Sequence, residues 1–180
     1  MKIKYKNELI KSMEYLSKKK DTIFLGQSVS YSGNAIFNTL TKVKKNKKIE
    51  LPVAVDMQMG MSTGLAMNGF VPITCFPRFD FLILAFNQLV NHLDKMRSMT
   101  NNKFKPKVII RTSIGSIKPL NGGVQQTQNY TEIFKKTLTE VKVVYLKDPK
   151  TIFANFKKAY NDKNNFSYLF IENGDFYNEK

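Results

Sequence analysis

The most constraining feature of this sequence is an alternation of short, apolar runs with longer segments whose apolar residues recur at helical spacing. The short runs are bounded by turn residues and are predicted strands at residues 22–26, 51–55, 71–76, 107–112, 141–146 and 167–172. The longer segments are predicted helices at residues 6–19, 34–43, 57–67, 81–99, 149–161 and from residue 131. Strands this apolar must be covered on both faces, which requires a parallel sheet joined by right-handed crossovers. The sequence therefore predicts an α/β fold, a three-layer sandwich with a mostly parallel sheet of about six strands.

The chain is long enough to form one domain with its own core. It has 180 residues, of which 42% are hydrophobic and 12% aromatic, so its composition is not that of a disordered chain. No linker or internal repeat divides the sequence, and the lysine-rich residues 44–48 are predicted to be a loop. We expect a single domain over residues 1–180.

The predicted sheet also indicates where a ligand would bind. Ligands of open parallel sheets lie beyond the carboxyl ends of the strands. The candidate site-forming segments are therefore residues 26–34, 55–56, 77–81 and 113–129. The last segment contains Gly122-Gly123, which could cradle a phosphate, but without a following Lys-Ser/Thr this pair is more typical of a plain loop.

Cysteine usage and hydropathy indicate the compartment. The chain has one cysteine, Cys75, within an apolar run, so it can form neither a disulfide framework nor a cysteine metal site. Its acidic residues show no metal-ligand spacing, and we expect no metal site. The first 16 residues are charged throughout, and no segment approaches the roughly 18 apolar residues of a membrane span. We therefore expect a cytoplasmic protein without a membrane partner.

The net charge of +15 raises the question of a nucleic-acid partner. Lysine supplies nearly all of this charge, whereas recognition of bases and phosphates favours the bidentate fork of arginine. The three arginines are Arg78, Arg97 and Arg111. Because the lysines occur in short clusters on predicted helix ends and loops, we interpret them as a solvated surface. A basic patch with counterion-dependent binding is the less favoured alternative.

Four quoted segments carry a resemblance to a known family. They are "DTIFLGQSVSYSGNAIFNTL", "PVAVDMQMGMSTGLAMNGFVPI", "FDFLILAFNQLVNHLDKMR" and "KVVYLKDPKTIFANFKKAYND…YLFIEN". In order and spacing they resemble the transketolase-like pyrimidine-binding domain of thiamine diphosphate enzymes. The resemblance is specifically to the N-terminal domain of the beta subunit of the 2-oxoacid dehydrogenases, and it runs nearly end to end.

The second of these segments has small residues at helical spacing. Gly60, Gly64 and residues 62–66 would present small faces on successive turns, so another backbone could approach closely. In the family this helix packs at a subunit interface beside the cofactor. Ordinary tight packing of the helix on its own sheet is the alternative interpretation.

The resemblance also implies a cofactor pocket. Phe81 matches the aromatic residue that lies against the pyrimidine ring, with Phe79 and Met57 supporting it. The position of the family's glutamate, which promotes proton transfer on the cofactor, holds Val55. The neighbouring Asp56 is one residue out of register, and we expect it to be a helix N-cap.

At other positions, too, this sequence lacks the acidic or histidine residue of the family pattern. The acidic pair after the first strand is Gln27-Ser28 here, and the histidine-bearing loop is matched by Thr127-Gln128-Asn129 on the substrate side. A later family histidine falls on Thr137. The only histidine, His92, lies in the middle of a predicted helix, where we expect a structural or surface role. Compared with the family pattern, the apolar residues of the pocket are thus retained better than its acid-base groups. No residue is assigned as catalytic.

The resemblance implies a beta-like subunit of a thiamine diphosphate enzyme that acts on a 2-oxo acid or ketose, as an oxidoreductase or transferase. The family's diphosphate and Mg²⁺ are held by a Gly-Asp-Gly…Asn motif that is absent here, so an alpha-like partner subunit would supply them. Self-association to a dimer within an α2β2 heterotetramer is then expected. The alternative is a non-catalytic structural or regulatory homologue that has lost the cofactor chemistry.

Overall fold

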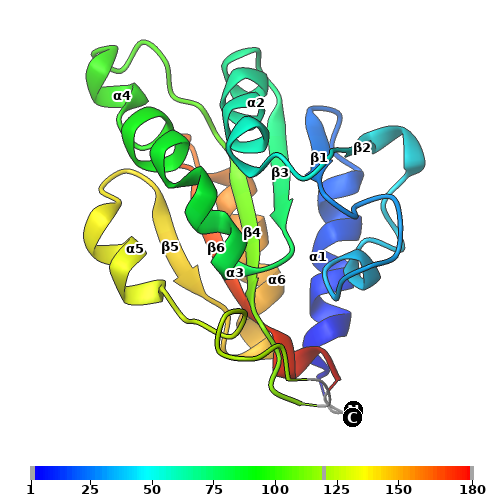
Figure 1. Cartoon of the computed structure of the whole chain (residues 1–180). Helices are drawn as coiled ribbons and strands as arrows, with labels where there is room; N and C mark the ends of the chain where they lie inside the picture. Colours follow the sequence, from blue (N-terminus) through cyan, green and yellow to red (C-terminus); the bar gives the residue numbers. More distant parts are fainter. Residues whose placement is uncertain (1–2, 119–120, 179–180) are drawn as a thin grey trace.

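The computed structural model describes residues 3–118 and 121–178, which form a six-stranded sheet with helices on both faces (Figure 1). The strand order is β2-β1-β3-β4-β6-β5, and every neighbouring pair is parallel. The strands are β1 (Thr22–Gly26), β2 (Lys48–Glu50), β3 (Val71–Phe76), β4 (Ile109–Ile114), β5 (Lys142–Tyr145) and β6 (Tyr168–Asn173). The predicted α/β class, the parallel sheet and its six strands are confirmed.

The helices divide the core into two clusters, one on each face of the sheet. On one face, side chains of α1 (Tyr5–Ser17) and α6 (Pro149–Asn161) pack against the sheet. On the other face lie α2 (Val55–Met67), the helical segment that begins with α3 (Phe79–Leu82), and α5 (Thr131–Thr137). Figure 1 shows this second group in front of the sheet and α6 behind it. All six residues of β3 and of β4 are buried, as expected for central strands covered by helices on both faces.

Local sequence signals account for the best-predicted helix, α6. The Asp148 side chain caps it by accepting a hydrogen bond from the Lys150 N–H at 2.9 Å, and Pro149 occupies the first turn, where no N–H is needed. Ile152, Phe156 and Ala159 are fully buried at helical spacing. The predicted and observed bounds of this helix are therefore the same.

The predicted helix at residues 34–43 is wrong. The segment contains one 3₁₀ turn, η1 (Phe37–Thr39), in which the Thr39 hydroxyl donates to the Ile36 carbonyl at 2.7 Å. The Asn34 side chain accepts from the Phe37 N–H at 2.9 Å. Side chains of this kind bond to nearby backbone and so compete with a regular helix. Ile36 and Leu40 are buried as the helical spacing indicated, but a turn rather than a helix buries them.

The predicted strand at residues 51–55 is also wrong. β2 ends at Glu50, and the Leu51 N–H still donates to the Gly26 carbonyl at 3.0 Å before Pro52, which has no N–H, leaves the sheet. The helix α2 then begins at Val55, two residues earlier than predicted, and its N-cap is Ala54. Asp56 is therefore not the N-cap; it lies in the first turn, and its carboxylate accepts from Gln88 at 3.4 Å.

The predicted long helix at residues 81–99 exists but is irregular. It runs from α3 through a 3₁₀ turn, η3 (Ile83–Ala85), and a π-helical turn, η4 (Gln88–Leu93), to α4 (Met96–Met99). At the end of the π turn the buried Asp94 accepts backbone hydrogen bonds from Thr139, Glu140 and Val141. These bonds tie the helix to the segment before β5. His92 is exposed on this helix.

No helix among the described residues is long and apolar enough to cross a membrane. Within the same residues, no group of three or more histidine, cysteine or acidic side chains is arranged to hold a metal ion.

Candidate functional site

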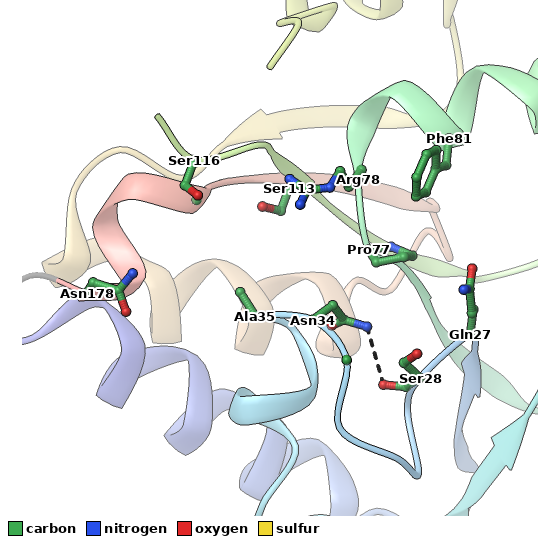
Figure 2. A pocket seen from close by; sticks show the side chains of 12 residues that line it. Gln27, Ser28, Asn34, Ala35, Pro77, Arg78, Phe81, Ser113, Ser116 and Asn178 are labelled. Carbon is green, nitrogen blue, oxygen red and sulfur yellow. Dashed lines mark hydrogen bonds between the residues drawn. The ribbon is translucent and has the colours of Figure 1, made fainter. Parts of the chain in front are cut away.

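A cavity of about 250 Å³ opens where β1, β3, β4 and β6 end (Figure 2). This is the carboxyl edge at which the fold predicts a ligand. Its lining residues are Gln27, Ser28, Gly33, Asn34, Ala35, Pro77, Arg78, Phe81, Ser113, Ser116, Gly174 and Asn178. We call this cavity the edge pocket. Three of the predicted site-forming segments contribute to it, and residues 119–120 of the third lie outside the described residues.

The loop after β1 forms one wall of the edge pocket and is held by Glu50. The Glu50 carboxylate accepts backbone N–H bonds from Ser28, from Val29 at 2.9 Å and from Ser30 at 2.7 Å. Ser28 has a left-handed φ of 55°, a conformation that non-glycine residues adopt only when their surroundings impose it. Glu50 thus fixes the orientation of Gln27 and Ser28, and its own oxygens are occupied in doing so.

An aromatic side chain forms the opposite wall. Phe81 is partly exposed, and its ring faces the edge pocket. Phe79, two residues earlier, is fully buried, with its ring centroid 5.5 Å from Tyr130 and 5.0 Å from Phe134. Phe79 therefore supports the start of α3 from inside the core.

Arg78 is the only charged residue among the described residues that line the edge pocket. Its guanidinium lies against two glycines: a Cβ on Gly115 would be 2.8 Å from Nη1, and one on Gly122 would be 3.6 Å away. The same Cβ on Gly115 would stand 1.8 Å from the Gln126 carbonyl, so this loop can pass close to Arg78 only because glycine is present.

The other predicted site residues lie outside the pocket wall. Val55 is partly buried and packs on the core beneath α2, whereas Met57 is 45% exposed on the same helix. Thr127 and Gln128 donate side-chain hydrogen bonds to the carbonyls of Gly123 and Val124, at 3.0 and 2.9 Å. The structure thus brings Gln27 and Phe81 together at the edge pocket. Cofactor contact by any of the predicted residues stays a prediction.

A buried polar network lies on the α1/α6 face of the sheet. Arg111 on β4 donates to both carboxylate oxygens of Glu172 on β6, at 2.7 and 2.9 Å, and to the Thr39 hydroxyl at 3.0 Å. The Tyr177 hydroxyl donates to the same carboxylate. Arg111 and Glu172 are both fully buried. We call these four residues the Arg111 network; sequence reasoning missed it, although an arginine and a glutamate inside two apolar runs were a visible signal.

Burial and charge shift the ionisation of this network. Burial alone would lower the pKa of Arg111, but the adjacent Glu172 carboxylate more than offsets this and raises it. Cys75, on the neighbouring strand, has its thiol pKa raised to about 11 because it is buried. Both groups therefore keep one ionisation state across the neutral range, which is typical of structural groups.

The edge pocket has the groups of a binding site. It offers an aromatic face, the amides of Gln27 and Asn34, hydroxyls and one cation. No carboxylate, histidine or cysteine is among its described lining residues, so none of the usual general acids and bases is present there. The arrangement can bind and orient a polar ring or an anion.

Comparisons with known proteins agree with this architecture. Residues 7–177 match the family described as "Transketolase, pyrimidine binding domain". A pyruvate dehydrogenase E1 component subunit beta from Gracilaria tenuistipitata var. liui is 27% identical over 170 residues, which is 93% of this chain and 51% of that protein. A 2-oxoisovalerate dehydrogenase subunit beta from Bacillus subtilis (strain 168) is 25% identical over 151 residues, covering 82% of this chain and 45% of that protein. The chain spans about half the length of the curated relatives it matches.

Solved structures share the fold at lower sequence identity. A structure described as "Split gene transketolase, inactive beta4 tetramer" superposes with a TM-score of 0.73 at 16% identity, covering 97% of this chain and 53% of that one. Transketolase from Campylobacter jejuni subsp. jejuni NCTC 11168 gives a TM-score of 0.72 at 11% identity, covering 94% of this chain and 25% of that one. At these identities the likeness shows the fold alone.

Proposed function

The chain belongs to the family of transketolase pyrimidine-binding domains, as its sequence motifs indicated, and from this premise we propose that it is a beta-like subunit of a thiamine diphosphate enzyme. The proposed substrate is a 2-oxo acid or a ketose. The observation that carries the proposal is the family match over residues 7–177 together with an edge pocket at the carboxyl end of the sheet that Phe81 and Gln27 line.

The residues of the edge pocket fit the pyrimidine end of this cofactor. Phe81 provides an aromatic face for a planar heterocycle, and the Gln27 amide can both donate to and accept from ring substituents. The cavity of about 250 Å³ is smaller than the roughly 300–1,000 Å³ of a complete small-molecule site. A pocket of this size suits one part of a larger ligand.

The rest of the cofactor would be bound elsewhere. The chain lacks the family's Gly-Asp-Gly…Asn motif, and the described residues contain no cluster suited to a metal. We therefore infer that an alpha-like partner holds the diphosphate and its Mg²⁺. When bound, thiamine diphosphate supplies a nucleophilic carbon, and the role of this chain is to orient the ring and exclude water.

An apolar surface on α2 and η3 suits the partner or a second copy of this chain. Val53, two residues before α2, and Leu84 on η3 are 73% and 67% exposed, and Met57 and Met61 on α2 are also exposed. A Cβ on Gly64 would meet nothing within 4 Å, so packing on its own sheet does not explain this glycine. We propose that this surface forms a dimer interface within an α2β2 assembly. A related fold described as a beta4 tetramer supports association of beta-type chains.

One observation favours the alternative, a non-catalytic homologue. Val55 occupies the family's glutamate position, and neither a carboxylate nor a histidine is among the described lining residues of the edge pocket. The described lining residues can orient a ring but supply no group to move its proton. A structural or regulatory subunit would need no such group.

Binding of thiamine diphosphate with Mg²⁺, measured by calorimetry, tests the proposed function. The chain co-expressed with a diphosphate-domain partner should bind tightly, and the chain alone weakly or not at all. Phe81→Ala should weaken binding by the complex roughly 5- to 150-fold, the range for loss of base–aromatic stacking. Phe104→Ala, at an exposed phenylalanine outside the pocket, is the matched control. A complex that does not bind the cofactor, or binds it unchanged after Phe81→Ala, would contradict the proposal.

Val55→Glu separates the enzyme from the non-catalytic homologue. In an enzyme, a carboxylate placed near the ring should speed hydrogen exchange at the thiazolium carbon, up to roughly 10²- to 10⁴-fold for a positioned proton-transfer group. In a homologue, the substitution should only cost stability, because Val55 packs on the core. Exchange and thermal unfolding are measured on the same complex. Lost stability with unchanged exchange favours the homologue.

A further inference from the structure

Arg78 differs from the other two arginines because its charge has no partner among the described residues. Arg111 is paired with Glu172, and Arg97 is paired with Glu140 at 3.4 Å and donates to the Asn164 carbonyl at 3.0 Å. Arg78 makes no ion pair or hydrogen bond with the described part of the chain, although it is half-buried. A partly desolvated guanidinium without an acceptor is costly, and the cost falls when an anion binds.

The position of Arg78 is fixed although its charge is unpaired. Its backbone is extended, with φ −140° and ψ 146°, at the turn from β3 into α3. The guanidinium lies along the loop at Gly115 and Gly122. Figure 2 shows the side chain directed towards Ser113 and away from Phe81. The edge pocket therefore has an aromatic end at Phe81 and Gln27 and a cationic end at Arg78.

No carboxylate among the described residues forms an ion pair with Arg78. Glu50 accepts three backbone N–H bonds, and Asp175 accepts two, from Ile117 at 2.7 Å and Lys118 at 3.0 Å. Asp80, two residues after Arg78, accepts from the Tyr130 hydroxyl at 3.4 Å. These carboxylates accept bonds from groups other than Arg78, and none of them lies within ion-pair distance of it, so the guanidinium has no direct counter-ion among the described residues.

We propose that Arg78 binds the oxyanion of the substrate and is a specificity-determining residue for substrates that carry one. The planar fork of arginine matches both carboxylate and phosphate oxygens, and Ser113 and Ser116 line the pocket beside it. The anion would be the carboxylate of a 2-oxo acid or the phosphate of a sugar phosphate. This assignment rests on the proposed function, because it takes the anion to be part of the substrate of the proposed enzyme.

The test uses the full chain alone, titrated separately with inorganic phosphate and with acetate while backbone amide shifts are followed by NMR. Saturable shifts should appear at Gly115 and Ser116 on the loop beside the guanidinium. Arg78→Gln should weaken the binding about 10- to 150-fold, the range for lost hydrogen bonds to a charged group. Whichever probe binds more tightly identifies the carboxylate or the phosphate as the source of the anion.

Two further variants make the result specific. Lys118→Gln removes the same charge from an exposed residue of the same loop and should leave the affinity within about 2-fold, as expected for a surface charge in water. Arg78→Lys keeps the charge without the fork, so intermediate affinity is expected, and it replaces Arg78→Gln if that variant does not fold. Anion binding that Arg78→Gln leaves unchanged, or no saturable binding by the wild-type chain, would overturn the assignment.

The outcomes separate this inference from the proposed function. Anion binding through Arg78 in a chain whose complex never binds thiamine diphosphate would keep the anion site and remove the proposed enzyme. Cofactor binding by the complex without an Arg78-dependent anion site would keep the proposed enzyme and remove the anion site.

Discussion

The Arg111 network and the edge pocket lie near the same edge of the sheet, yet they use arginine in opposite ways. Arg111 is fully buried and makes three hydrogen bonds to Glu172 and Thr39. Arg78 is half-buried and has no hydrogen-bond partner among the described residues. A charge completely removed from water must be paired within the chain, whereas a charge at a cavity mouth can be left for a ligand.

The difference teaches which polar groups stabilise the fold and which are available for binding. The Arg111 network joins β4 to β6 and, through Tyr177 and Thr39, holds the segments that follow β6 and β1. The edge pocket is built on that rigid base from loops whose side chains are still accessible. Changes in the network should therefore affect stability, and changes in the pocket should affect binding.

The largest effect is expected from Glu172→Gln, which would leave the Arg111 charge buried without its counter-ion. Removing one partner of a buried pair costs about 3–5 kcal/mol, so the free energy of unfolding in urea should fall by that amount. The double variant Arg111→Met with Glu172→Leu should recover much of the loss because no unpaired charge is left. A loss below about 1 kcal/mol for Glu172→Gln would show that the network is not structural.

A smaller effect concerns Cys75 at high pH. Its thiol pKa is raised to about 11 in the folded chain and is about 8.5–9 when unfolded, so only the unfolded state loses the proton between these values. Stability is therefore fully present below pH 8.5 and should fall by about 2–3 kcal/mol as the pH rises through 11.

Urea unfolding of wild type and Cys75→Ala across this pH range isolates the contribution of the thiol. Ionisation of buried tyrosines also lowers the free energy of unfolding at high pH, but it does so equally in wild type and Cys75→Ala. If the two proteins lost stability in parallel, the thiol would have no role in the pH dependence.

The smallest effect on stability is expected from Arg78→Gln. Because this side chain has no partner among the described residues, its loss should change the free energy of unfolding by about 0.5 kcal/mol or less. The same variant should weaken anion binding, so a change at Arg78 acts on binding, whereas a change in the Arg111 network acts on stability. A cost comparable to that of Glu172→Gln would mean that Arg78 belongs to the structural group.

The location of the edge pocket could largely be predicted from the sequence. The residues that line and support it could be predicted less well. The positions of Gln27 and Phe81 at the edge pocket follow from their places just after predicted strands and from the family resemblance. Glu50 acts through hydrogen bonds to the loop after β1, 20 to 22 residues away in sequence, and no local pattern indicates which backbone groups it will meet. The helix predicted over residues 34–43 failed for the same reason, since its buried spacing was satisfied by a turn.

The sequence by itself determined the parallel α/β sheet, because runs that are apolar on both sides can be buried only between two layers of helices, and periods of 2 and 3.6 residues are fixed by the backbone. It also indicated the carboxyl edge of the sheet, where the edge pocket lies. Only the tertiary structure decided which arginine would be structural. Parallel pairing sets Ser113 opposite Glu172 and so brings that glutamate, 61 residues away in sequence, within reach of Arg111. Arg78, at the turn from β3 into α3, forms no ion pair with the described residues. Pairing of the kind that Arg111 makes depends on strand order and register.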